Sequence, residues 1–223
     1  NPGKDRAMRA AVCYEFGKPL VIEDVQLDPP KAGEVLVKVV ACAICHSDVH
    51  KIRGDWGGKL PTVAGHEAAG VVEAVGPGVT MVKPGDHVVI SLLRACGRCF
   101  FCNQGQPHLC STEFALTNES RLHAADGTSI EQGIKVAGFA EYAVVDQSQL
   151  VSIPKDMPLD SASLLACGVI TGLGAVVNTA KVGPGQSVVV IGAGGVGLNA
   201  IQGAALSGGD PIIAVDLLDS KVA

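Results

Sequence analysis

The sequence predicts an α+β protein of two domains, in which an all-β, barrel-like domain precedes the first βαβ unit of a doubly wound parallel sheet. Three observations predict this: short β-branched runs punctuated by Gly and Pro early in the chain, a change of texture after about Pro154, and a glycine-rich turn between two apolar runs near the end. We expect the domains to cover residues 8–156 and 157–223.

The predicted strands of the first domain are short and roughly alternating in polarity. They lie at Glu34–Ala41, Gly70–Val75, His87–Leu92 and Glu141–Val145. Gly- and Pro-rich segments such as Gly76–Gly78 and Lys83–Asp86 separate them, which is typical of an all-β domain with long loops. Met8 opens the first patterned segment, so we leave Asn1–Ala7 outside the predicted fold as a ragged start.

The second domain is predicted from helical segments followed by a strand, a helix and a strand. The helical segments are Ser161–Ala166 and Thr171–Thr179; the apolar strands are Ser187–Ile191 and Pro211–Val215, joined by a helix to about Leu206. A uniformly apolar strand is typical of a parallel sheet that is buried on both faces. A doubly wound domain needs about six strands, so we expect a longer protein, with a natural, non-catalytic truncation as the alternative.

Composition and charge exclude several classes of protein. With 48% hydrophobic and 17% charged residues, the chain can form an ordinary core. Its net charge of −5 and lack of a basic cluster argue against a nucleic-acid partner. The opening stretch has no signal-peptide core, and Gly, Asn and Gln interrupt the most apolar segment, Ser187–Leu206, so we expect a cytoplasmic protein without a membrane partner.

Four of the eight cysteines fall within 15 residues, in the pattern C-x2-C-x2-C-x7-C. They are Cys96, Cys99, Cys102 and Cys110. Without a secretion signal, such spacing favours a metal over disulfides or buried thiols. Four thiolates leave no ligand position for water, so we predict a structural zinc site. His108 lies in the same loop and is expected to be a surface residue.

A second set of motifs carries a resemblance to a known family. Gly65–Gly70, continuing to Gly76 and Val79, matches the pattern G-H-E-x2-G-x5-G-x2-V. Upstream lies Cys45–His50, with the sequence CHSDVH, and downstream lie the four cysteines and Ala166–Gly168, with the sequence ACG. By these motifs the chain resembles zinc-dependent medium-chain alcohol dehydrogenases, which join a GroES-like β-barrel catalytic domain to a Rossmann domain.

The resemblance implies a catalytic zinc held by Cys45, His66 and Cys167. Three protein ligands keep a fourth position open for water or substrate, and zinc there acts as a Lewis acid that lowers the pKa of a bound alcohol. It also places Asp48 behind His66, where a carboxylate fixes the imidazole tautomer, and Glu67 near the metal.

The resemblance further implies a proton relay. Ser47 accepts the alcohol proton and His50 delivers it to solvent, although His50 could instead be a solvated loop residue, because some relatives work without a relay histidine. His46 is placed against the cofactor pyrophosphate, where a histidine should hold NAD more loosely than an arginine would.

The glycine-rich turn predicts dinucleotide binding. Its motif residues are Gly192, Gly194, Gly195, Val196 and Gly197. Such a turn alone is weak evidence, but this one follows an apolar strand and opens a helix, whose N-terminus stabilises phosphate. Asp216, 19 residues after Gly197, fits the acid that binds the adenosine ribose of NAD. Lys221 matches a family lysine near that ribose, or is a solvated helix residue.

We therefore expect an enzyme that interconverts an alcohol with its aldehyde or ketone, using two zinc ions and NAD. The resemblance implies a homodimer or homotetramer and a small alcohol or aldehyde as substrate. Trp56, Leu92 and Ile134 are candidate pocket residues, and a Trp near the zinc favours aliphatic or benzylic alcohols.

Three alternatives remain at this point. A glutathione-dependent formaldehyde dehydrogenase would need cations at the pocket mouth, for which Arg53, Arg94 and Arg121 are candidates. A zinc-stabilised binding module without catalysis predicts one zinc and no NAD binding. Zinc-free quinone reductases share the fold, but the seven intact ligand residues argue against them.

Overall fold

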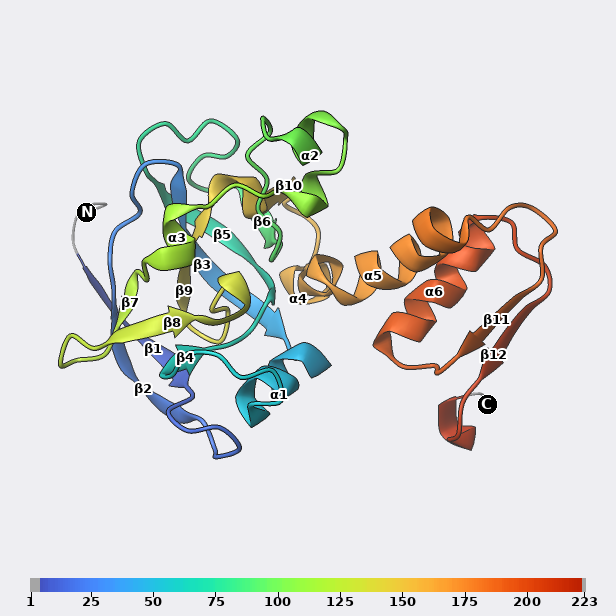
Figure 1. Ribbon diagram of the computed structural model, residues 1–223, viewed down its shortest axis with the longest axis horizontal. Coiled ribbons are helices and arrows are strands. Elements are labelled where there is room, and N and C mark those ends of the chain that lie inside the picture. The colour runs from blue at the N-terminus through green and yellow to red at the C-terminus, as the bar shows by residue number, and fades with distance from the viewer. Residues whose placement is uncertain (1–4, 222–223) are drawn as a thin grey trace. The chain divides into compact units, whose positions relative to one another are not determined.

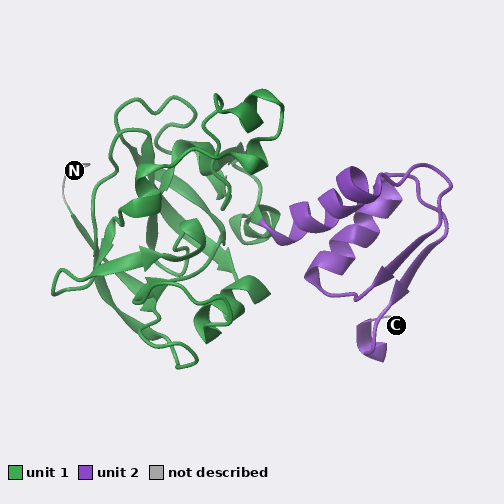
Figure 2. Cartoon of the chain, viewed as in Figure 1, with its two compact units in different colours: residues 1–166 green, residues 167–223 purple. Residues whose placement is uncertain are grey.

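The computed structural model describes residues 5–221 and divides the chain into two compact units, 1–166 and 167–223, here called unit 1 and unit 2 (Figure 2). The division falls between Ala166 and Cys167. The predicted domain bounds of 8–156 and 157–223 stay a prediction. Each unit is described by itself.

Unit 1 is built on two five-stranded sheets (Figure 1). The first has the order β1 (Arg6–Val12), β2 (Val21–Leu27), β7 (Leu122–His123), β8 (Ser129–Gln132), β4 (Thr62–Val63). The second has the order β10 (Leu150–Ile153), β6 (His87–Ile90), β5 (Glu67–Val75), β3 (Glu34–Ala43), β9 (Tyr142–Asp146). The β4–β8 pair is parallel and the others are antiparallel. The predicted β domain is confirmed, with all four predicted strands present.

Strand β3 lies between two hydrophobic clusters. Leu36 packs into the cluster that includes β1 and β2, whereas Val35 and Val37 pack into the cluster that includes β5 and β6. Successive side chains of a strand point to opposite faces, so an apolar run such as Val35–Val37 feeds both clusters. Burying each of these side chains contributes about 1.5–3 kcal/mol.

Short helices cover the strands of unit 1. The α-helices are α1 (His46–Arg53), α2 (Phe100–Asn103), α3 (Ala115–Asn118) and α4 (Leu159–Ser163), and the 3-10 turns are η1 (Pro107–Leu109), η2 (Gly133–Lys135), η3 (Gln147–Gln149) and η4 (Leu164–Ala166). Ala162 of α4 and Ala166 of η4 pack against Ala69 and Val89 in a third cluster. The chain is therefore anchored against β5 up to its last residue in unit 1.

The structure corrects the expectation that residues up to Ala7 lie outside the fold. Strand β1 begins at Arg6, whose Nη2 lies 3.0 Å from Glu73 Oε1 and whose guanidinium lies 4.2 Å from the Tyr142 ring centre. An arginine at a strand end can thus be held by tertiary partners that its neighbours in sequence do not reveal. Residues 1–4 lie outside the described residues.

Unit 2 contains the predicted βαβ unit. It runs through α5 (Gly168–Gly174), the π-helical segment η5 (Ala175–Ala180), β11 (Val188–Ile191), α6 (Gly195–Leu206), β12 (Ile212–Val215) and η6 (Asp219–Lys221). β11 and β12 pair in parallel, as predicted. Within the described residues Val189 of β11 is 57% and Ile191 84% exposed, and the expected burial of β11 on both faces stays a prediction. The packing of β11 comes mainly from β12 and α6.

The length and hydropathy of the helices within residues 5–221 decide whether any of them could span a membrane. No single one is long and apolar enough to cross a bilayer. One pair of helices reaches that length and composition, but only when its two members are counted together across a bend. The pair is Leu159–Ala166 and Gly168–Ala180.

A buried ion pair connects the two sheets of unit 1. Arg121, which directly precedes β7, donates from Nε to Glu34 Oε2 at 2.9 Å and from Nη2 to Glu34 Oε1 at 2.6 Å. Glu34 begins β3, and Arg121 is only 1% exposed. The hydrogen bonds to Glu34 raise the pKa of Arg121. The expectation that Arg121 offers a cation at a pocket mouth is therefore wrong, because its charge is neutralised inside the unit.

We predict that Arg121→Ala lowers the free energy of unfolding of unit 1 by about 3–5 kcal/mol, because it leaves the buried Glu34 carboxylate unpaired. The matched control is Lys31→Ala, since Lys31 pairs with the exposed Glu119 at 2.9 Å and should cost less than about 1 kcal/mol. The single tryptophan, Trp56, lies in unit 1, so urea titration by its fluorescence measures both variants. Equal losses in the two variants would contradict the role of the pair.

Candidate functional site

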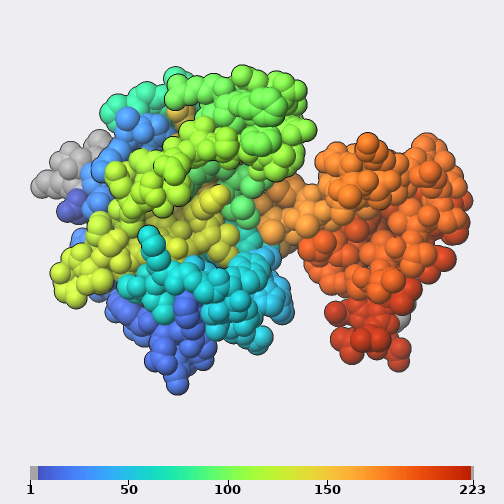
Figure 3. Space-filling view, in the orientation of Figure 1, coloured from blue at the N-terminus to red at the C-terminus, as the bar shows by residue number. Residues whose placement is uncertain are grey.

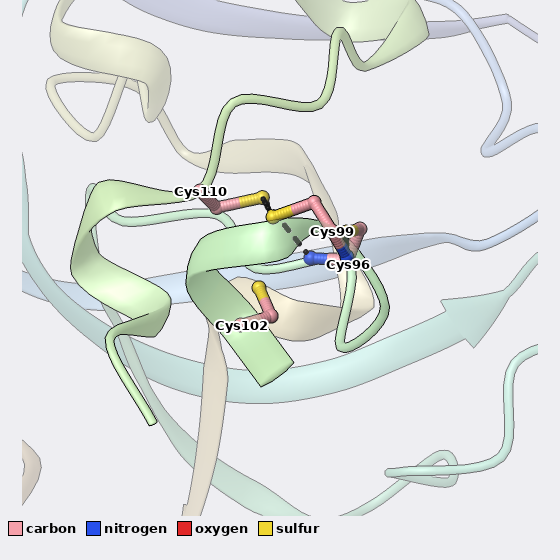
Figure 4. Close-up of side chains that lie close together, drawn as sticks. All are labelled: Cys96, Cys99, Cys102 and Cys110. Carbon is pink, nitrogen blue, oxygen red and sulfur yellow. Dashed lines mark hydrogen bonds between the residues drawn. The ribbon is translucent and has the colours of Figure 1, made fainter. Parts of the chain in front are cut away.

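The four closely spaced cysteines converge in one lobe of unit 1. Cys99 precedes α2, Cys102 lies within it, and Cys110 follows η1. The four sulfur atoms lie within 4.8 Å of one another (Figure 4). Cys99 Sγ and Cys110 Sγ are 3.8 Å apart. Four thiolates at about 2.3 Å around a tetrahedral zinc lie about 3.8 Å from each other, so the lobe fits a closed zinc site.

Backbone N–H groups of the lobe point at its sulfur atoms. Cys99 N donates to Cys96 Sγ at 3.2 Å, and Cys96 N donates to Cys110 Sγ at 3.4 Å. The N–H groups of Cys102 and Ser111 lower the pKa of Cys99 to about 6, whereas burial raises the pKa of Cys102 to about 11. Donors of this kind stabilise thiolates, which are the form that binds a metal.

The lobe forms part of the surface of unit 1, where its atoms are coloured green (Figure 3). His108 is exposed there, so the prediction of a surface histidine is confirmed. The lobe is thus a surface loop with little apolar core of its own.

A second cluster gathers a thiol, an imidazole and a carboxylate from separate segments. Cys45 is the residue before α1, His66 directly precedes β5, and Glu67 is its first residue. Their ligand atoms lie within 4.8 Å of one another. His66 and Glu67 are both buried. Buried ionisable groups in contact need a partner that balances their charge, and a metal ion is the partner that suits this set of donors.

Asp48 connects the segments of this second cluster. Its Oδ1 accepts hydrogen bonds from Gly65 N at 2.8 Å and from His66 Nδ1 at 3.0 Å, and its Oδ2 accepts one from Cys45 N at 3.1 Å. The Asp48 side chain is fully buried. Because Nδ1 of His66 donates to Asp48, the lone pair of Nε2 is left for a metal.

Gly65 allows this arrangement because no other residue fits its backbone. Its φ is +94°, and a Cβ atom there would lie 2.6 Å from the backbone nitrogen of Phe139. The segments approach this closely because Gly138 N donates to Gly65 O at 2.8 Å and Phe139 N donates to Ala64 O at 3.0 Å. The glycine before the histidine is therefore required by packing.

Cys167 is the first residue of unit 2. Its neighbour Ala166 is the last residue of unit 1 and is buried there. In its own unit, Cys167 Sγ lies 4.0 Å from Thr171 Oγ1. Its assignment as the third catalytic-zinc ligand stays a prediction.

Helix α1 carries the predicted relay residues. Ser47 is half-buried in its first turn, and His46 is exposed. His50 Nδ1 lies 2.7 Å from Asp55 Oδ2, a contact that sequence reasoning missed. The His50 ring stacks on Trp56, with centres 5.3 Å apart. Trp56 is 59% exposed, and the stacking places this predicted pocket residue beside the predicted relay histidine.

The other two predicted pocket residues lie in different surroundings. Leu92 packs at the edge of the cluster formed around β3, β5 and β6. Ile134 lies in η2 with φ of 49° and lines a hollow together with Lys59, Thr117 and Lys135. Their shared role in substrate binding stays a prediction.

The expectation that Arg94 lies at a pocket mouth is wrong, because Arg94 is buried. Its Nε donates to Gln149 Oε1 at 2.8 Å, and its Nη2 donates to Lys135 O at 3.2 Å. Burial lowers the pKa of its guanidinium. Gln149 Nε2 also donates to Lys135 O, at 3.1 Å. Arg94 and Gln149 therefore both bind the carbonyl of Lys135. This carbonyl lies in a segment in which Ile134, Lys135 and Ala137 all have positive φ.

The glycine-rich turn of unit 2 links β11 to α6. A Cβ on Gly197 would lie 1.7 Å from Gly192 O, so only glycine fits there. By contrast, a Cβ on Gly194 or Gly195 would meet nothing within 4 Å, which leaves open space in front of the α6 N-terminus. Val196 is exposed beside them. Exposed N–H groups at the start of a 12-residue helix suit an anionic group.

Asp216 is held at the carboxyl end of β12. Its Oδ1 accepts a hydrogen bond from Leu218 N at 3.0 Å and its Oδ2 one from Ala193 N at 2.8 Å, and these bonds lower its pKa. Lys221 Nζ lies 3.8 Å from Oδ2. A hollow at this edge is lined by Ile191, Gly192, Val215, Asp216 and Leu217. Ligands of open α/β sheets bind at the carboxyl ends of the strands.

We predict that Asp48→Asn makes one of two bound zinc ions labile. An amide has one acceptor oxygen for three N–H donors, and loss of a carboxylate behind a ligating histidine lowers metal affinity by about 10–100-fold. The control is Asp55→Asn, since the Asp55 side chain is exposed and contacts only the ring of His50 among the described side-chain hydrogen bonds. Zinc per chain is measured after dialysis against graded chelator. Equal retention in both variants would contradict the role of Asp48.

Comparison with known proteins identifies the family. Residues 31–155 match the alcohol dehydrogenase GroES-like domain. An S-(hydroxymethyl)glutathione dehydrogenase of Paracoccus denitrificans is 45% identical over 96% of this chain and 59% of its own length. The crystal structure of an alcohol dehydrogenase zinc-binding domain protein from Burkholderia ambifaria has a TM-score of 0.92 at 39% identity, covering 98% of this chain and 61% of its own.

A second solved structure, the benzyl alcohol dehydrogenase of Acinetobacter calcoaceticus, has a TM-score of 0.88 at 37% identity and covers 98% of this chain and 60% of its own. The chain thus spans about 60% of the length of these relatives. The family match includes the Asp48-centred cluster and the four-cysteine lobe. The chain belongs to the family of alcohol dehydrogenases with a GroES-like domain.

Proposed function

We propose that this chain provides the catalytic domain and the start of the cofactor domain of an oxidoreductase that interconverts an alcohol with its aldehyde or ketone, using zinc and NAD. The observation that carries the proposal is the buried group of Cys45, His66 and Glu67 with Asp48 bound behind the imidazole. A purely structural zinc has four protein ligands, whereas Cys45, His66 and Cys167 would supply three and leave a position open for substrate. The four-cysteine lobe already supplies a closed site of that kind.

Cys45, His66 and Cys167 would hold the catalytic zinc, and Cys96, Cys99, Cys102 and Cys110 the structural one. Bound zinc would supply a Lewis acid that lowers the pKa of the substrate hydroxyl. Asp48 keeps His66 in the tautomer whose Nε2 can ligate, and it fixes the backbone of Cys45 at the same time. Glu67 lies next to the metal position and adds negative charge there.

Ser47 and His50 would carry the substrate proton away. Ser47 lies one residue after His46 in the first turn of α1, and His50 lies one turn later. The carboxylate of Asp55 holds Nδ1 of His50, so that Nε2 is the ring nitrogen that exchanges a proton with solvent. Hydride transfer needs a site with little water, so a relay of this kind lets the proton leave without opening the site.

Unit 2 would bind NAD along the glycine-rich turn. Gly194 and Gly195 leave room for the pyrophosphate, and the N-terminus of α6 stabilises its charge. Asp216 is an ionised carboxylate beside the turn, where it can accept hydrogen bonds from ribose hydroxyls, with Lys221 nearby. His46 would approach the pyrophosphate from α1.

The leading substrates are aliphatic or benzylic alcohols, with Trp56, Leu92 and Ile134 as pocket residues. The relative named for S-(hydroxymethyl)glutathione supports a second candidate, the glutathione adduct of formaldehyde. Of the three arginines first considered for it, Arg94 and Arg121 are engaged internally. Two lysines, Lys59 and Lys135, line the hollow beside Ile134 and could meet a charged substrate there.

The proposal also covers the location, the oligomeric state and the partners of the protein. We expect the protein to act on small molecules in the cytoplasm as a homodimer or homotetramer, without nucleic-acid or membrane partners. Size-exclusion chromatography with light scattering measures the oligomeric state.

In a full-length protein that contains this chain, we predict that NAD reduction requires Cys45. Cys45→Ser should abolish turnover of primary alcohols, because it removes a metal ligand. Cys42→Ala should keep most of the activity, because Cys42 belongs to neither group of candidate metal ligands. Steady-state rates with aliphatic alcohols, benzylic alcohols and formaldehyde plus glutathione identify the substrate class. Activity retained in Cys45→Ser would refute the ligand set. A protein with one zinc and no NAD binding would instead be the non-catalytic binding module.

We also predict that the full-length protein prefers NAD over NADP by at least about tenfold in kcat/KM. The Asp216 carboxylate would repel the phosphate of NADP and lose a charge-assisted hydrogen bond worth about 1.5–3 kcal/mol. Asp216→Asn should narrow the preference by admitting NADP, because the amide keeps the shape and removes the charge. Asp219→Asn is the control, an exposed carboxylate in the same segment. Equal wild-type efficiency with both cofactors would remove Asp216 from this role.

A further inference from the structure

Helix α1 presents two histidines on one exposed face. His46 and His50 are four residues apart, which places their side chains one above the other on a helix. Their ring centres lie 4.8 Å apart, with the rings inclined at 64°. Both are open to solvent, since His46 is exposed and the His50 side chain is 37% exposed. Both residues lie on α1, which Figure 1 labels, and α1 belongs to unit 1.

The spacing of the two rings is that of imidazoles that share one metal ion. A late transition-metal ion bonds imidazole nitrogen at about 2.0–2.1 Å. The centre of each bound ring then lies about 3.2 Å from the ion. If the nitrogen–metal–nitrogen angle is between a right angle and the tetrahedral angle, the two ring centres are about 4.5–5.2 Å apart. The observed separation falls inside this range without any change of backbone.

The surroundings of His50 also prepare it as a ligand. Asp55 Oδ2 lies 2.7 Å from Nδ1, so Nε2 is the ring nitrogen that this contact leaves for a metal, and the Trp56 ring stacks on the imidazole and restricts its rotation. A carboxylate behind an imidazole fixes the tautomer and raises the basicity of the ligating nitrogen. Asp55 therefore does for His50 what Asp48 does for His66 in the buried cluster.

We propose that His46 and His50 form a third metal site, an open surface chelate for a divalent late transition-metal ion such as Ni²⁺, Cu²⁺ or excess Zn²⁺. Two imidazole ligands favour these ions over Mg²⁺ and Ca²⁺, which prefer oxygen. Solvent water completes the coordination. The site differs in donor chemistry from both thiolate-containing clusters.

Occupancy of this site has a consequence that rests on the proposed function. A metal ion on Nε2 of His50 would remove the nitrogen that exchanges the substrate proton, so divalent ions in excess should inhibit turnover. Binding itself does not depend on that function. The two can therefore be tested separately.

The binding experiment uses protein already loaded with zinc, so that both cysteine-containing clusters are filled. Ni²⁺ is titrated by calorimetry, and the fluorescence of Trp56, the single tryptophan, is followed in parallel because it stacks on His50. We expect one Ni²⁺ per chain with quenching of Trp56, and no response to Mg²⁺. His46→Asn and His50→Gln should each weaken Ni²⁺ binding at least about tenfold, since one of two imidazole ligands is lost.

The matched control is His108→Gln, because His108 is exposed in unit 1 but belongs to the four-cysteine lobe and not to α1. It should bind Ni²⁺ as the wild type does. The proposal is overturned if zinc-loaded protein binds no Ni²⁺, if His46→Asn and His50→Gln bind it unchanged, or if His108→Gln loses as much affinity as they do. Ni²⁺ binding at the pair without inhibition of the full-length enzyme would support the site and refute the relay role of His50.

Discussion

The three hydrogen bonds accepted by Asp48 hold the candidate catalytic site together. One comes from the backbone before α1, one from the backbone at Gly65 and one from the ring of His66. These groups belong to segments that the chain brings together from 17 and 18 residues away. Because the carboxylate is fully buried, its bonds are not in exchange with water, and the alternative of an unpaired buried charge is costly. The positions of Cys45 and His66 therefore depend on one side chain.

The same physical solution occurs twice, each time with one residue of α1. Asp48 binds the ring of His66 inside the unit, and Asp55 binds the ring of His50 at its surface. In the first case burial makes the contact permanent and leaves one nitrogen for a buried metal. In the second, exposure lets the ring exchange protons or ions with solvent. Burial thus distinguishes the two histidines, although the residue types and contacts are alike.

Charged residues show where local sequence misleads. Arg94 and Arg121 were candidates for the pocket mouth because a glutathione-dependent formaldehyde dehydrogenase would need cations there. The structure binds Arg121 to Glu34 across the two sheets and Arg94 to Gln149 and the backbone of Lys135. Their partners are 87, 55 and 41 residues away in sequence. No periodicity or spacing reveals such pairs, because they form only when segments distant in sequence pack together.

The sequence alone determined the features whose atoms come from one short segment or one regular pattern: the four-cysteine lobe, the apolar run of β3 and the strand–turn–helix around Gly192–Gly197. In each, the residues that act together are neighbours along the chain, so spacing and polarity suffice. Tertiary structure decided which faces are buried, that β1 begins at Arg6, that Trp56 stacks on His50, and that Asp48 binds both halves of the candidate zinc site. Those outcomes depend on contacts between distant segments, whose geometry is fixed only when the cores of the unit pack.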